Sequence, residues 1–365
     1  MMPEFRKISA LAVLTCSLVL GLLGPGCATY DREGMDPLAA AQIEATKVRR
    51  EFKPASELRR QILRLNPDHV TGQDVQQVLA QCPAPRIINI HGGIYPVHRK
   101  MISFSEFLIG MGYPGACITN PGDGTYTFSC YDSSKMIAGV IAWYYEREGL
   151  RPMLVGHSQG GMQVVKVLRK FAGPPSARLH VWNPLTWKEE PACDYVDPLT
   201  GERRPVVGLT LPFASATAAG GITRLIPNQW DMLTKLRVVP DSVEEFTGFY
   251  KGMDLLGGDF LGYGPANHFC AKNQAVVRNV RLPTAYTHRS IPDSKHLLNS
   301  QQIKDWIDNY HPLNEHVSKP TVDIVFDSDS RNILWAADIW FTIKKHWVLE
   351  LQRYLQAKPA LEANR

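Results

Sequence analysis

The strongest constraint on the fold of this chain is a short apolar run that leads directly into a helical pattern across a glycine-flanked serine. Residues 151–168 read RPMLVGHSQGGMQVVKVL: the apolar run ends at Gly156, and apolar residues at helical spacing resume after Gly161. Glycines on both sides of Ser158 remove side chains that would collide in a sharp strand-to-helix turn. The pattern predicts an exposed Ser158 hydroxyl at the carboxyl edge of a sheet, beside a helix N-terminus.

Short apolar runs alternate with helical patterns on both sides of this turn. Strands are expected at RIINI (86–90), ACITN (116–120), PMLVG (152–156), RLHVWN (178–183), FTGFYKGMD (246–254) and NVRLPTAYT (279–287). Helices are expected at FSEFLIGMG (104–112), SSKMIAGVIAWYYEREG (133–149), GMQVVKVLRKF (161–171) and NSQQIKDWIDNY (299–310). Parallel neighbours need crossover connections, so the alternation predicts an α/β fold with a mainly parallel sheet and helices on both faces.

Composition supports a folded chain without a nucleic-acid partner. Of 365 residues, 44% are hydrophobic and 21% are charged, which is ordinary for a globular protein. The formal charge of +5 comes from interspersed Lys and Arg with no long basic run. The length allows one large domain or two modest ones.

The first 27 residues have the order of a secretion signal. Arg6 and Lys7 precede an apolar stretch over 8–23, and small residues follow up to Cys27. The sequence LLGPGC resembles the processing box of bacterial lipoproteins, although Gly24 stands where that box has an apolar residue. Lipidation of Cys27 is expected, and it would place the protein in the cell envelope. The alternatives are plain cleavage of the signal and an uncleaved anchor. All three place the protein outside the cytoplasm. Disulfide pairing among the cysteines after Cys27 stays open.

Four regions follow the signal. Residues 28–80 are expected to form a linker and an N-terminal helical segment, and 81–312 an α/β core. Within that core, 185–245 interrupts the alternation and is expected to be an insertion, either a cap or lid or a packed segment. Residues 313–365 form a C-terminal extension with an expected strand at TVDIVF (321–326) and an aromatic helix. Apolar residues at helical spacing predict that this helix packs into the core.

The motifs HGG, after the RIINI strand, and GHSQGG together resemble the α/β-hydrolase superfamily, with the elbow similar to that of bacterial lipases and esterases. The resemblance covers most of 84–312. It implies a serine hydrolase with a catalytic triad in the chain order serine, acid, histidine, and no metal or organic cofactor.

Under this resemblance Ser158 is the nucleophile and His296 is the base. His296 lies in SIPDSKHLLNSQQIKDWI, after a strand and just before an amphipathic helix, which is where the family places its histidine. His268 in GPANHFC is the alternative, and the remaining downstream histidines are interpreted as loop or surface residues.

The acid is expected just past the strand that precedes the histidine. Asp254 ends FTGFYKGMD and is the first candidate, with Asp259 and Asp241 as alternatives. An aspartate that is not the acid would serve as a turn residue that bonds its own backbone.

Two backbone amides are expected to form the oxyanion hole. The resemblance implies that one comes from Gly93, in the loop after the RIINI strand, and the other from Gln159, next to the nucleophile. The residues expected to support the loop and the elbow are His91, Gly92, Gly156 and Gly160.

These inferences predict an exported, lipid-anchored serine hydrolase that cleaves carboxylic esters, small-molecule or lipid, through an acyl-enzyme. Fold does not determine substrate, so other ester hydrolysis and acyl transfer stay open. The alternative from another class is a catalytically inactive surface binding lipoprotein built on a hydrolase scaffold. Acyl length, alcohol moiety and oligomeric state are not predicted.

Overall fold

The protein is built around a five-stranded, entirely parallel sheet in the order β1-β2-β7-β9-β11. Its strands are β1 (Ile87–Ile90), β2 (Met153–His157), β7 (Leu211–Thr217), β9 (Val243–Lys251) and β11 (Val276–Leu282). The computed structural model describes residues 52–174, 176–221, 224, 227–258, 267–312 and 331–363. The sequence-based prediction of an α/β fold with a parallel sheet is confirmed.

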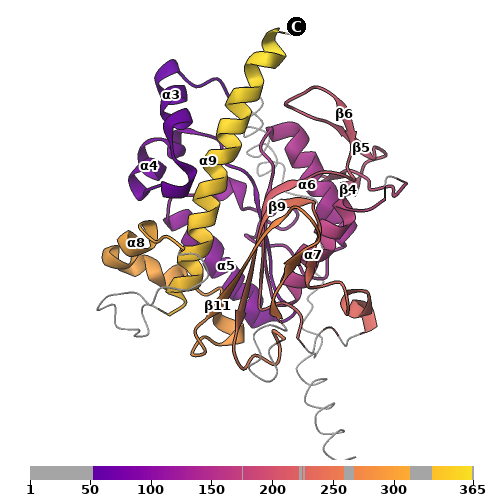
Figure 1. The fold of residues 1–365 in the computed structure, drawn as a ribbon, viewed down its shortest axis with the longest axis vertical. Helices are drawn as coiled ribbons and strands as arrows, with labels where there is room; N and C mark the ends of the chain where they lie inside the picture. The colour runs from indigo at the N-terminus through magenta and orange to yellow at the C-terminus, as the bar shows by residue number, and fades with distance from the viewer. Residues whose placement is uncertain are drawn as a thin grey trace, which may run out of the picture.

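Helices cover both faces of the sheet (Figure 1). Successive strand residues point to opposite faces, so Ile87 packs into the core under α5 (Tyr95–Gly110) and α9 (Ile333–Ala363). Its neighbour Ile88 packs into the core under α6 (Ser134–Glu148) and α7 (Gln159–Phe171). Strands that are buried on both faces explain why their sequences are continuous apolar runs.

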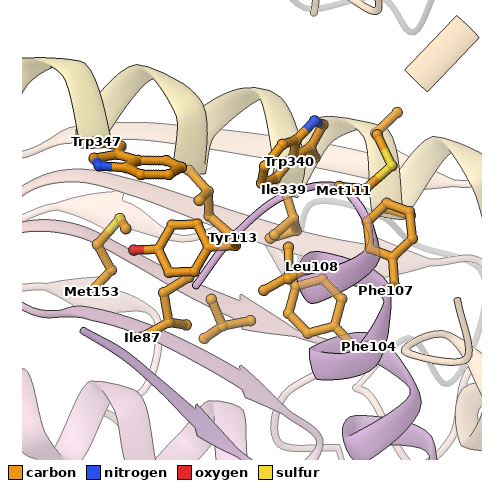
Figure 2. Close-up of a cluster of buried hydrophobic side chains, with 14 of the residues drawn as sticks. Ile87, Phe104, Phe107, Leu108, Met111, Tyr113, Met153, Ile339, Trp340 and Trp347 are labelled. Atoms are coloured by element: carbon orange, nitrogen blue, oxygen red, sulfur yellow. The ribbon is translucent and has the colours of Figure 1, made fainter. Parts of the chain in front are cut away.

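Helix α9 lies across the first of these faces and is part of the core. Trp335, Trp340 and Trp347 are each fully buried along it. Figure 2 shows Trp340 and Trp347 above Tyr113 and the side chains of α5. The expectation that this aromatic helix packs into the core is confirmed. In the described part of the chain, no helix has the length and apolar character needed to span a membrane.

Ion pairs attach α9 to β11, to β9 and to the segment just before β2. From its start toward its end they join Asp338 to Arg278 of β11 (2.5 Å), Lys345 to Glu245 of β9 (2.8 Å), and Glu350 to Arg151, just before β2 (2.6 Å). Burial favours the neutral form of Glu245, but hydrogen bonds and charge from His346 and Lys345 outweigh it and lower its pKa to about 2. Because the charges are buried, each pairing fixes the register of α9 on the sheet.

Helices α3 (Ser56–Arg64) and α4 (Gly72–Gln77) flank the same region. Thr71 and Asp74 form a capping box at the start of α4, where each side chain satisfies the other's backbone amide. The Gln352 amide of α9 donates to the carbonyls of Ile62 (3.0 Å) and Leu65 (2.9 Å) at the end of α3. The N-terminal helical segment is therefore part of the fold from residue 52 onward; the expected signal, with Cys27, lies outside the described residues.

Two strand predictions were wrong. ACITN contains a short 3-10 turn, Gly115–Cys117, and RLHVWN contributes only Trp182–Asn183, which pairs with Lys188–Glu189 in a separate hairpin. The central strand is instead LPFASAT, β7, which was expected to lie within the 185–245 insertion. Its small residues suggested a loop, but they let α7 approach closely, since a Cβ on Gly161 would lie only 3.3 Å from Cβ of Ala216.

Other described elements are helix α8 (Gln301–Asp308), a short antiparallel pair, Asp194–Val196 with Arg203–Pro205, and a short parallel pair, Val238–Val239 with Cys270–Ala271. The five cysteines in the described part of the chain form no disulfide bond with one another. The expected strand TVDIVF lies outside the described residues.

Replacing Trp340 with alanine should lower the free energy of unfolding by about 3 to 5 kcal/mol, because it leaves a large cavity between α9 and the sheet. Chemical denaturation would measure the loss. The matched control is Trp230→Ala, since the Trp230 side chain is 59% exposed and its removal should change stability by less than about 0.5 kcal/mol. Equal losses in the two variants would contradict a core role for α9.

Candidate active site

Polar residues gather where four parallel strands end at their carboxyl edge. Ser158 directly follows β2, Asp254 follows β9, His288 follows β11, and the loop 91–93 follows β1. Because the carboxyl ends of parallel strands lie at one edge of a sheet, segments far apart in sequence meet there. The structure brings the side chains of Ser158, His288 and Asp254 into one hydrogen-bonded chain.

Ser158 sits in a sharp, strained turn between β2 and α7. Its backbone angles are φ 56° and ψ −120°, and its amide donates to the carbonyl of Thr217 in β7 (2.8 Å). A Cβ on Gly156 would lie 2.5 Å from the carbonyl carbon of Gly160, and one on Gly160 would lie 2.7 Å from the His91 carbonyl oxygen. The predicted strand, turn and helix are confirmed, and the flanking glycines are required by close backbone packing. The predicted exposure of Ser158 was wrong, because the residue is only 8% exposed.

The hydrogen bonds of His288 determine its tautomer. Its Nδ1 lies 2.8 Å from Oδ2 of Asp254, and its Nε2 lies 3.0 Å from Oγ of Ser158. An ionised carboxylate only accepts, so Nδ1 carries the hydrogen and Nε2 is left to accept the Ser158 hydroxyl proton. This is the arrangement in which a serine can be deprotonated as it attacks.

The Asp254 carboxylate is buried, with 4% exposure, and is held in place by its own loop. Its Oδ1 accepts the amide of Gly257 (2.9 Å), where a Cβ would collide with the carboxylate. Burial favours the protonated form, but the hydrogen bond and charge of His288 and the Gly257 amide outweigh it and hold the pKa of Asp254 below its usual value. Asp254 is therefore ionised and oriented toward His288.

The structure does not bring His296 to Ser158, as was predicted; the histidine that it places against Ser158 is His288. His296 lies in the short turn Lys295–Asn299, and its Nε2 bonds the carbonyl of Arg331 (3.0 Å). The prediction extended the preceding strand to residue 287, whereas β11 ends at Leu282. Pro283, which lacks an amide hydrogen, was the available signal that the strand ends early and that His288 is the first histidine beyond it.

Two of the alternative residues, His268 and Asp241, bond other groups and not this chain of hydrogen bonds. The exposed His268 bonds the Tyr250 hydroxyl (2.9 Å). Asp241 accepts from the amide of Gln274 (2.7 Å) and from the side chain of Asn273 (2.5 Å), as a loop aspartate does. Asp259 lies outside the described residues.

The loop after β1 packs directly on the elbow. A Cβ on Gly92 would lie 2.9 Å from Cβ of Ser158, and Gly93 lies against the Gln159 side chain. His91 donates from Nδ1 to the Gly92 carbonyl (2.7 Å), and burial lowers the pKa of His91 to about 4, so its ring is neutral. Helix α7 begins at Gln159, so the amide of that residue has no partner within the helix and is free for an anion.

Tyr131 and Cys130 hold this loop from the side, and the sequence contained no pattern that singled them out. The Tyr131 hydroxyl donates to the Gly93 carbonyl (2.9 Å), and the Cys130 thiol lies 3.5 Å from Oε1 of Gln159. Both therefore contact residues expected to provide the oxyanion amides.

His157, inside the elbow, is fully buried with its ring centre 5.1 Å from that of His288. Burial and the nearby His288 ring lower the pKa of His157 to about 3. Its imidazole is therefore neutral at physiological pH, and it supports the site through packing.

Comparison with models of known protein families and with curated proteins gave no match for this chain. In the described residues, no three His, Cys, Asp or Glu side chains are grouped so that they could hold a metal ion.

The neutral His157 should make the protein less stable in acid. The unfolded chain protonates this histidine near pH 6.5, but the folded chain does so only near pH 3. Between these values the unfolded state binds more protons, so this contribution to stability is complete above pH 6.5 and falls as the pH drops. In His157→Gln, the slope of unfolding free energy between about pH 4 and 6 should decrease by up to about 1.4 kcal/mol per pH unit.

Chemical denaturation across this pH range would measure the slopes. His268→Gln is the control, since this exposed ring should leave the slope unchanged. Coincident slopes for the wild type and His157→Gln would contradict the buried neutral state.

Proposed function

We propose that this protein is a serine hydrolase that cleaves carboxylic esters through an acyl-enzyme. The observation that carries the proposal is the hydrogen-bonded chain from Ser158 Oγ to His288 Nε2 (3.0 Å) and from His288 Nδ1 to Asp254 (2.8 Å). The strained backbone at Ser158 supports it, because such strain concentrates at functional sites.

In the proposed reaction, Ser158 Oγ attacks the ester carbonyl while its proton passes to Nε2 of His288. Asp254 stabilises the resulting imidazolium, which then gives the proton to the departing alcohol. Water attacks the acyl-enzyme with His288 again as base, which releases the acid and restores the serine.

The amides of Gly93 and Gln159 are proposed to hold the negative oxygen that forms on the carbonyl. Gln159 starts α7, where unpaired amides and the helix dipole favour negative charge. An amide donor of this kind is typically worth roughly 3 kcal/mol of transition-state stabilisation. The chain is accordingly proposed to have the α/β-hydrolase fold, a finer assignment than the α/β architecture described above.

Exposed apolar side chains beside the site favour a substrate with an apolar acyl or alcohol group. Met253 (72% exposed) and Leu255 (45% exposed) flank Asp254, and Tyr95 (55% exposed) closely follows Gly93. A small-molecule or lipid ester is the proposed substrate class. Export and a lipid anchor at Cys27 remain proposals that rest on the N-terminal sequence.

The first test is labelling by a fluorophosphonate probe, which reacts with an activated serine. The wild-type protein should label and should hydrolyse p-nitrophenyl esters, whereas Ser158→Ala should not label and should lose at least about 10³-fold in kcat. Assays with detergent and with acyl chains of increasing length would define the ester preference. A folded wild-type protein that neither labels nor hydrolyses any ester would contradict the proposal and favour a binding role.

The second test separates the two histidines. His288→Ala should lower kcat by about 10³-fold or more, because it removes the base. His296→Ala should stay within about tenfold of the wild type, since the His296 ring bonds the Arg331 carbonyl, whereas the ring that bonds Ser158 and Asp254 is that of His288. The reverse order of losses would show that the base was assigned to the wrong residue.

A further inference from the structure

The loop that carries His288 has little regular structure of its own. Residues 286–296 contain only short 3-10 turns at His288–Ser290 and Lys295–Asn299. A general base must stay within hydrogen-bonding reach of the proton that it accepts. The position of His288 therefore depends on whatever fixes this loop, which we call the histidine loop.

Asn332 makes the most specific contact with the histidine loop. Its side-chain amide donates to the carbonyls of Ser290 (2.6 Å) and Asp293 (3.0 Å), and the residue is fully buried. Because both partners are carbonyl oxygens, the orientation of the amide is determined. Asn332 also has a left-handed backbone, φ 67°, immediately before α9 begins at Ile333.

The start of α9 also contacts both ends of the histidine loop and the end of strand β7. The amide of Leu334 donates to the Tyr286 hydroxyl (3.2 Å), and His296 donates to the Arg331 carbonyl (3.0 Å). The Trp335 indole donates to the Thr217 hydroxyl (2.9 Å), and the carbonyl of Thr217 accepts the amide of Ser158. The start of α9 therefore contacts both Thr217, which bonds Ser158, and the loop that carries His288.

Helix α5 supports the loop from its other side. The Ser103 hydroxyl donates to Asp293 (2.7 Å) and Lys100 pairs with the same carboxylate (2.5 Å). The Lys100–Asp293 pair involves charged, partly exposed groups, whereas Asn332 acts from a fully buried position. The contacts of Asn332 are therefore disturbed less by solvent and salt than this ion pair.

We propose that Asn332 is a positioning residue for the reaction: it holds the backbone at Ser290 and Asp293 so that His288 lies between Ser158 and Asp254. The proposal rests on the proposed hydrolase function. The proposal extends the candidate active site to the start of the C-terminal helix. Helix α9 is attached by ion pairs to β11, to β9 and to the segment before β2. It therefore connects the histidine loop to the strands that carry the other site residues. A misplacement of about 1 Å in such a group can lower a rate by about 10²-fold.

Two substitutions separate the amide contact from backbone strain. Asn332→Asp keeps the shape but places carboxylate oxygens against two carbonyls, and Asn332→Gly removes the donors while accepting the left-handed backbone. Gln352→Glu is the matched control. Gln352 lies on α9, and its side-chain amide also donates to two carbonyls. These carbonyls belong to Ile62 and Leu65 at the end of α3, far from the histidine loop.

The measurements are kcat and KM for a p-nitrophenyl ester, the pH profile of kcat, the rate of fluorophosphonate labelling, and thermal stability. Both Asn332 variants should lower kcat and the labelling rate about 10-fold to 100-fold with a smaller change in KM, and should alter the pH profile. Gln352→Glu should lower thermal stability but leave kcat within about threefold. Asn332 variants within threefold of the wild type, or losses matched by Gln352→Glu, would overturn the proposal.

A readout without turnover distinguishes failure of this inference from failure of the proposed function. The His288 Nδ1 proton shared with Asp254 can be observed by NMR, and it should shift or broaden in Asn332→Asp but not in Gln352→Glu. If the wild type does not label but this difference is seen, the hydrolase function fails while the positioning role stands. If the wild type labels and the proton is unchanged in Asn332→Asp, the positioning role fails.

Discussion

The left-handed backbone at Ser158 is the constraint on which the rest of the site depends. A non-glycine residue with φ 56° is retained only when its surroundings determine it, and here the Thr217 carbonyl, the contact of Gly156 with Gly160, and the loop after β1 all do so. Each of these contacts needs a backbone approach that a side chain would prevent. The glycines around the serine are therefore a consequence of packing, and the position of the Ser158 hydroxyl within reach of His288 follows from them.

Helix α9 holds the strands of the site in place relative to one another. This matters because Ser158, Asp254 and His288 follow separate strands. Its buried tryptophans close one face of the sheet, while its ion pairs to β11, β9 and the segment before β2 prevent it from sliding. Dispersion and apolar burial are nondirectional, whereas paired buried charges have one favourable geometry. The apolar face thus supplies stability to the helix, and the charged pairs supply the register that places Asn332 against the histidine loop.

The parts of the structure that depend on residues close together in the sequence could be predicted, and those that depend on distant contacts could not. The strand, turn and helix around Ser158 are encoded within eighteen residues, and Asp254 follows its strand closely. The identity of the histidine could not be read in the same way, because contacts of Asn332 and Ser103 with distant residues shape the loop between β11 and α8. Strand β7 was missed because Ala214, Ser215 and Ala216 have weak strand propensity, and burial between two helical layers decides their conformation.

Two imidazoles lie close together behind the serine, and burial gives them different chemistry. The rings of His157 and His288 are 5.1 Å apart, so two positive charges there would repel strongly in a site largely closed to water. Desolvation and the proximity of His288 keep the pKa of His157 near 3, so it stays neutral when its neighbour accepts a proton. The ionised Asp254 is hydrogen-bonded to Nδ1 of His288, so in the proposed reaction it stabilises the charge that His288 gains with the serine proton. Burial therefore makes His157 a poor base, and the ring nitrogen that can accept the Ser158 proton is Nε2 of His288.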